Sequence, residues 1–149
     1  MSTIISEPYL HLIEYCETDA MRIVHHAEYI KWMEYARHRF LLSNGVDWAE
    51  IERERGLMMP MLSVSTEYRR LLRFGDTVAV RAQLEAFDGV YLRLSYRMEN
   101  WKTGELCAIG RTKSGFVDRA YRPVLLQDAY EEAYKKLIAA KTGAAAEAV

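Results

Sequence analysis

The sequence predicts one α+β domain, in which an antiparallel sheet of five or six strands curls around one long helix. Apolar residues follow a helical spacing over residues 27–44 and, after Gly56, a spacing of two. Turn signals such as Asp88-Gly89 separate the later segments, which is typical of hairpin-linked antiparallel strands. The chain has 149 residues, 50% of them hydrophobic, which suits a single domain, expected over residues 1–141.

The long helix follows a first strand at about residues 9–15. The apolar stripe of the helix recurs at steps of three or four residues: Tyr29, Met33, Ala36 and Phe40. Further apolar residues widen the stripe almost all the way round: Trp32, Tyr35, Leu41 and Leu42. We therefore expect a largely enclosed helix, which Asn44-Gly45 ends before a shorter helix over residues 48–55.

Strands are predicted over residues 61–72, 77–86, 90–99 and 106–118. Their strict alternation of apolar and polar residues indicates a sheet with one buried and one partly solvated face. A final helix is predicted over residues 127–141, with these residues on one face: Ala129, Tyr130, Ala133, Tyr134 and Leu137. Residues 142–149 have almost no bulky side chain, so we expect them to form a flexible tail.

The composition excludes several classes of protein. With 20 basic and 21 acidic side chains the net charge is -1, so no nucleic-acid partner is expected. The N-terminal segment lacks the pattern of a signal peptide, and no apolar run is long enough to span a membrane. Two cysteines fit neither a zinc spacing nor a disulfide framework, which favours the cytoplasm.

The most informative segment places Asp19 close in sequence to His25, His26 and the start of the long helix. The first N–H groups of a helix have no partner within it and carry the positive end of its dipole. They can hold a developing oxyanion while Asp19 acts on a carbonyl carbon or on a water molecule beside it. Taken alone, Asp19 is more simply a cap or turn residue. For His25 and His26 two interpretations stay open: one of them lines the acyl pocket, or it is a structural residue packed against the helix start.

Neither the histidines nor the cysteine nearby favours another chemistry. Adjacent residues on a helix point about 100° apart, so His25 and His26 are poor joint ligands, and no metal or other cofactor is expected. Cys16 is expected to be a small buried residue, because its acidic neighbours Glu17 and Asp19 oppose a reactive thiolate.

Residues 15–29 resemble the signature of the hotdog-fold acyl-CoA thioesterases, in the branch of 4-hydroxybenzoyl-CoA thioesterase. That signature is an aromatic residue, two or three further residues, Thr-Asp or Cys-Asp, a short loop, and a V-x-[YH]-x-x-Y segment that opens the central helix; here it reads from Tyr15 to Tyr29. The corner Phe74-Gly75-Asp76, the turn at residues 103–108, and residues 116–118 followed by Arg122-Pro123 also resemble that family. The resemblance covers roughly residues 9–126.

The resemblance implies hydrolysis of an acyl-CoA thioester, with Asp19 as catalytic nucleophile or general base and the backbone N–H of His26 polarising the carbonyl. It also implies a homodimer, often paired into a homotetramer, with the site between protomers and with Ser63, Ser65 or Tyr68 supplied by the partner. The residues expected to bind substrate are His25, Tyr29, Ser65, Tyr68, Arg69, Arg73 and Arg111, with the arginines holding phosphates of the carrier.

Two departures from the family pattern leave alternatives open. Ala20, Met21 and Arg22 stand where many members have glycines, and Glu28 stands where they have Asn. Arg22 either pairs with Asp19, lowering the pKa of its carboxyl, or turns to solvent. The alternative functions are hydrolysis of thioesters carried on an acyl carrier protein, and a non-catalytic acyl-binding dimer.

Overall fold

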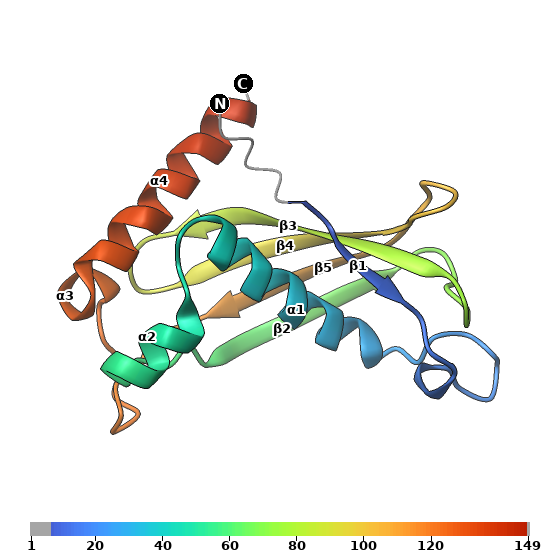
Figure 1. Cartoon of the computed structure of the whole chain (residues 1–149), viewed down its shortest axis with the longest axis horizontal. Helices are drawn as coiled ribbons and strands as arrows, with labels where there is room; N and C mark the ends of the chain where they lie inside the picture. The colour runs from blue at the N-terminus through green and yellow to red at the C-terminus, as the bar shows by residue number, and fades with distance from the viewer. Residues whose placement is uncertain (1–6, 149) are drawn as a thin grey trace.

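The computed structural model describes residues 7–148, with side chains up to residue 141. Within this range five strands form one antiparallel sheet in the order β1-β3-β4-β5-β2 (Figure 1). Their bounds are β1 Tyr9–Leu12, β2 Met61–Tyr68, β3 Thr77–Phe87, β4 Leu92–Asn100 and β5 Leu106–Ser114. The predicted α+β architecture and its antiparallel sheet are confirmed.

Helix α1 (Glu28–Ser43) lies across one face of the sheet, within one residue of its predicted bounds (Figure 1). Trp32, Met33 and Phe40 are fully buried between helix and sheet. The prediction of a largely enclosed helix was wrong for the side of α1 that faces away from the sheet, where Tyr35 is 48% exposed and Leu42 is 44% exposed. Tyr9 on β1 meets the ring of Tyr35 edge to face at 5.4 Å, yet about half of the Tyr35 side chain remains on the surface.

The two faces of the sheet follow from the alternation in the sequence. On β5, Gly110 faces α1, and an added Cβ there would collide with the sulfur of Met33. Its neighbour Arg111 therefore points to the opposite face, where its side chain pairs with Glu85 at 3.7 Å. Residues that lie opposite one another across paired strands, such as Ser65 and Arg111, share this outer face.

The remaining helices close one end of the sheet. Helix α2 (Trp48–Arg55) begins at Asp47, whose carboxylate accepts the N–H of Glu50 at 3.2 Å, and ends at Gly56 with φ 68°. The single C-terminal helix predicted from residue 127 is instead two helices, α3 (Leu126–Ala129) and α4 (Glu131–Ala148).

The break between α3 and α4 lies at Tyr130, whose backbone is extended (φ -157°, ψ 85°). There the ring of Tyr130 packs against the guanidinium of Arg55 at 3.8 Å. Of the flexible tail predicted over residues 142–149, the backbone of residues 142–148 continues α4, while the side chains of these residues and residue 149 lie outside the described part of the chain. None of the helices described is both long and apolar enough to cross a membrane.

Candidate active site

A tight loop carries Asp19 from the sheet toward α1. The short 3-10 turn η1 (Tyr15–Glu17) follows β1, and Thr18 then bridges Val24. Inside the loop, the N–H of Asp19 donates to the carbonyl of Ile23 at 2.9 Å, and Oδ1 of Asp19 accepts the N–H of Met21 at 2.8 Å. One carboxylate oxygen is thus held by its own loop, as in an Asx turn.

Arg22 has a left-handed backbone (φ 64°), a conformation that glycine adopts most easily. This accounts for the glycines that stand in this part of the loop in many members of the family that the sequence resembles. Its N–H donates to the carbonyl of Asp19 at 2.9 Å. Its side chain is exposed and, among the ion pairs of the described residues, forms none with Asp19. Of the two alternatives for Arg22, the structure therefore shows the solvent-facing one.

The chain enters α1 through an arrangement that leaves the N–H of His26 without an acceptor among the described residues. The N–H of His25 donates to the carbonyl of Glu17 at 2.8 Å, and Nδ1 of His25 accepts the N–H of Ala27 at 3.1 Å. The N–H of Glu28 donates to the carbonyl of His25 at 3.0 Å. Among residues 7–141 the N–H of His26 has no acceptor, so it remains available for a ligand at the positive end of the helix.

Two tyrosines join this helix start to the sheet. The hydroxyl of Tyr68, at the end of β2, donates to the carbonyl of His26 at 2.6 Å. The rings of Tyr29 and Tyr68 meet edge to face at 4.9 Å. Burial raises the pKa of Tyr29 to about 12, so this hydroxyl stays protonated near neutral pH and can donate a hydrogen bond but not act as a base.

Asp19, His26, Tyr29 and Tyr68 line one small cavity of about 210 Å³. Its other walls are apolar or basic: Met21, Ile23, Val24, Arg69, Arg70 and Leu71. The cavity therefore combines a carboxylate, the residue whose N–H lacks an acceptor, and two cations. These groups suit a reaction in which a neutral carbonyl becomes an oxyanion.

The structure brings together five of the nine predicted site residues: Asp19, His26, Tyr29, Tyr68 and Arg69. Tyr68 reaches the site of its own chain, whereas the sequence prediction assigned it to the partner. His25 does not line the cavity, because its ring caps the helix start and stacks on His26 at 4.1 Å.

The other three predicted residues lie elsewhere. Ser65 and Arg111 are on the outer face of the sheet, opposite α1, and the backbone N–H of Arg73 closes a turn on the carboxylate of Asp76 at 2.9 Å. Arg70, which was not among the predicted residues, takes a place in the cavity wall. Sequence spacing could not show this, because strand β2 ends at Tyr68 and the N–H groups of Arg69 and Arg70 both turn to the carbonyl of Cys107.

Two other residues near the site differ from expectation. Cys16, predicted to be buried, is exposed, because β1 ends at Leu12 and Cys16 lies in the turn that follows. Glu28, which stands where the family has Asn, pairs with Lys31 at 3.1 Å and does not line the cavity.

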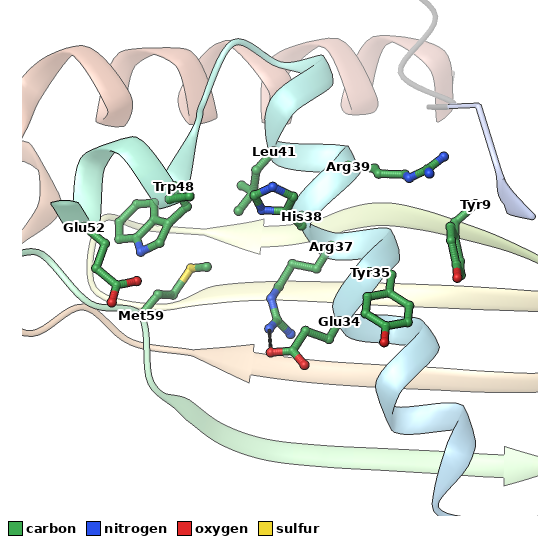
Figure 2. Close-up of a pocket in the computed structure, with 11 residues that line it drawn as sticks. Tyr9, Glu34, Tyr35, Arg37, His38, Arg39, Leu41, Trp48, Glu52 and Met59 are labelled. Carbon is green, nitrogen blue, oxygen red and sulfur yellow. Dashed lines mark ion pairs between the residues drawn. The ribbon is translucent and has the colours of Figure 1, made fainter. Parts of the chain in front are cut away.

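A larger cavity of about 610 Å³ lies over the outer side of α1, beside α2 (Figure 2). Arg37 and Glu34 form an ion pair of 3.7 Å there, and Figure 2 shows Trp48 and Met59 at the other end. None of the nine predicted site residues lines it. Volume alone therefore does not identify the reaction site, and we assign the site to the smaller cavity on the chemistry of its walls.

Comparisons with known proteins identify the family of the chain. Residues 14–138 match the family described as the thioesterase-like superfamily. The putative acyl-CoA thioesterase YneP of Bacillus subtilis is 29% identical over 128 residues, which cover 83% of this chain and 91% of that protein. A putative esterase of Synechocystis is 32% identical over 69% of this chain and 61% of its own length. The DHNA-CoA thioesterase of Staphylococcus aureus has a similar structure, with a TM-score of 0.83, 25% identity, and coverage of 91% of this chain and 93% of that one.

Proposed function

Because the chain belongs to the thioesterase-like superfamily, with the hotdog fold of its structural relatives, we propose that it hydrolyses acyl-CoA thioesters to a free acid and coenzyme A. The observation that carries the proposal is the shared cavity of Asp19 and His26, in which a carboxylate meets a helix start with a backbone N–H available to a ligand. The names of the relatives, acyl-CoA thioesterase and DHNA-CoA thioesterase, support the same substrate class.

In the proposed reaction the thioester carbonyl lies between these two groups. Asp19 attacks the carbonyl carbon, or takes a proton from a water molecule that attacks it. The carbonyl oxygen becomes an oxyanion, which the N–H of His26 stabilises. When the oxyanion collapses, the C–S bond breaks and the thiolate of coenzyme A leaves and takes up a proton. By the nucleophilic route, water then hydrolyses the acyl-aspartyl anhydride.

Two basic residues at the cavity supply a place for the phosphates of coenzyme A. Arg69 and Arg70 line the cavity and also a neighbouring open depression, which Glu105 and Leu106 complete. Guanidinium groups bind phosphate oxygens through paired hydrogen bonds. Of the three arginines predicted for this role, the proposal keeps Arg69, and it adds Arg70, because Arg111 faces the other side of the sheet.

The proposed assembly is a cytoplasmic homodimer joined through strand β2, which can pair again into a tetramer. In the described chain β2 pairs only with β5, so its outer edge has unpaired backbone groups. Leu62 is 51% exposed and Val64 37% exposed on this strand. A second β2 strand would satisfy the edge and cover these apolar side chains, which is the common remedy for an open edge.

The proposed activity is tested by release of free thiol from short, medium, long and aromatic acyl-CoA esters, with Asp19→Asn as the central variant. Asn keeps the oxygen that accepts the N–H of Met21 but removes the negative charge. We expect the rate to fall by about a hundredfold to ten-thousandfold. Asp128→Asn, a change at an exposed aspartate on α3, is the matched control. Equal turnover by wild type and Asp19→Asn would remove Asp19 from the mechanism, and turnover no faster than in buffer alone would support a non-catalytic acyl-binding protein.

A further inference from the structure

A buried carboxylate lies two residues before Asp19, in a residue to which the proposed reaction gives no role. Glu17 is only 8% exposed, and three elements direct donors at it. Nε2 of His11 on β1 lies 2.8 and 3.0 Å from its two oxygens, and the indole N–H of Trp32 on α1 donates to Oε2 at 3.0 Å. The N–H of Glu14 donates to Oε1 at 2.8 Å.

The polarity of this network follows from its chemistry. An ionised carboxylate only accepts, so Nε2 of His11 donates to Glu17, and in the neutral ring Nδ1 is then the acceptor. The hydroxyl of Tyr9, 2.9 Å from Nδ1, donates to it. Burial alone would raise the pKa of the Glu17 carboxyl, but its bonds with Glu14, His11 and Trp32 outweigh burial and lower that pKa. Glu17 is therefore ionised near neutral pH, and its oxygens are well supplied with donors.

Such a network is an inefficient way to stabilise a fold, because removing a charge from water costs about as much as its partners return. Its geometric effect is specific, however, because one carboxylate fixes the relative positions of β1, η1 and α1. A fully satisfied network of this kind makes a single arrangement rigid. Glu17 thus fixes the angle at which the chain leaves the sheet and enters the helix.

The backbone of Glu17 also restrains the two proposed reacting groups, the carboxylate of Asp19 and the N–H of His26. Glu17 lies two residues before Asp19, at the foot of the loop closed by Thr18 and Val24. Its carbonyl accepts the N–H of His25 at 2.8 Å, which holds the residue immediately before His26. The carboxylate on one side of the cavity and the N–H on the other are therefore anchored through the same residue.

We propose that Glu17 is a positioning residue that holds Asp19 and the N–H of His26 at the separation a thioester carbonyl requires. This inference rests on the proposed function. A change at Glu17 is therefore expected to reduce turnover more than substrate binding, because Arg69 and Arg70, the residues proposed to hold the carrier, come from another segment of the chain. An error of about 1 Å between reacting groups can cost about a hundredfold in rate.

The test compares wild type with Glu17→Gln, in which one acceptor oxygen becomes an NH₂ group that must face His11 or Trp32. We expect kcat to fall about tenfold to a hundredfold while KM for the same acyl-CoA ester changes by less than about twofold. Amide hydrogen exchange should become faster in residues 18–26. His11→Phe, which removes one donor and leaves the other two, should give the same pattern with a smaller effect, and it serves if Glu17→Gln does not fold.

The control is Glu131→Gln, which removes an exposed carboxylate and its 3.4 Å pair with Lys135 at the far end of the molecule. It should leave kcat and exchange in residues 18–26 unchanged. A folded Glu17→Gln protein with wild-type kcat and wild-type exchange in residues 18–26 would overturn the proposal, even if its melting temperature fell. If wild type hydrolyses no acyl-CoA ester, the proposed function fails, while the exchange measurement still decides whether Glu17 orders the loop.

Discussion

At the scale of single residues, the hydroxyl of Tyr68 is the direct link between the sheet and the helix start. It donates to the carbonyl of His26 at 2.6 Å, so the residue that offers its N–H to the proposed oxyanion is held by its own C=O. The peptide that contains this C=O also connects His26 to Ala27, where the helix is capped. Removal of the Tyr68 hydroxyl should therefore alter catalysis without creating a cavity in the core.

Tyr68→Phe keeps the ring against Tyr29 and removes only this hydrogen bond. We expect about 1 kcal/mol lower unfolding free energy, since the bond is partly exposed, and a lower kcat on acyl-CoA esters. Urea unfolding and steady-state kinetics measure the two effects. Tyr91→Phe, whose hydroxyl has no hydrogen bond among the described residues, should change neither. An unaltered kcat in Tyr68→Phe would show that the bond does not support the reaction.

Acid should weaken the network around Glu17. The pKa of this carboxyl is lower in the folded chain than the ordinary value of 4.5, so its stabilising contribution is complete above 4.5 and is lost as the pH falls through the folded value. The difference in unfolding free energy between wild type and Glu17→Gln should therefore be larger near neutral pH than well below 4.5. Urea unfolding of both proteins over this range tests the sign, and a constant difference would contradict it.

At the scale of elements, α1 approaches the sheet closely at one strand residue that has no side chain. Gly110 on β5 lies beneath Met33, and the methyl group of Met98 lies close by on β4. This contact sets the distance between α1 and the sheet near Met33, one turn after Tyr29 in the cavity wall. Glycine is required here for space, since its backbone is that of an ordinary strand.

Gly110→Ala should push Met33 away and strain the packing between α1 and β5. We expect a loss of about 1–3 kcal/mol in unfolding free energy, the usual cost of overpacking a core. Thermal or urea unfolding measures it. Ser65→Ala, on the exposed outer face of β2, should stay within about 0.5 kcal/mol of wild type. A Gly110→Ala protein as stable as this control would mean that the helix can shift without cost.

At the scale of the whole molecule, the main feature is the outer edge of β2, whose backbone groups have no pairing strand in the described chain. The opposite edge is the four-residue strand β1, whereas β2 is eight residues long and has exposed apolar side chains at Leu62 and Val64. The proposed dimer would pair the β2 edge of one protomer with the β2 edge of the other. Both copies of Tyr68, and the loops beside them, would then lie near one interface. The assembly is then part of the proposed site and not only a route to stability.

Charge placed on this edge should prevent the pairing. Leu62→Lys combined with Val64→Lys puts like charges against each other across the two-fold axis, so we expect monomers where wild type gives dimers or larger assemblies. Sedimentation velocity measures the mass, and circular dichroism checks the fold. Leu125→Lys, at a leucine that is also 51% exposed, is the matched control. A dimer that persists in the double variant would place the interface elsewhere.

The sequence was sufficient for most of the elements and for the core of the candidate site. The bounds of α1 and α2 and the order of the elements along the chain were predicted from apolar spacing and stop residues, because these are local properties of the chain. The pairing of Asp19 with the N–H of His26 was implied by the resemblance to the thioesterase family, and both residues line the same cavity. The single C-terminal helix was wrong, because a contact between Tyr130 and Arg55, distant in sequence, accompanies the break.

Only the tertiary structure decided which distant residues reach the cavity. Arg111 and Ser65 looked equivalent to other polar strand residues, but the strand register places them on the outer face, while Tyr68 on the same strand faces α1. Glu17 has no distinguishing motif in the sequence, and its role emerges from donors on β1 and α1 that meet it in space. Periodicity determines which side chains alternate along a strand, whereas the face that meets the helix depends on how the whole sheet packs.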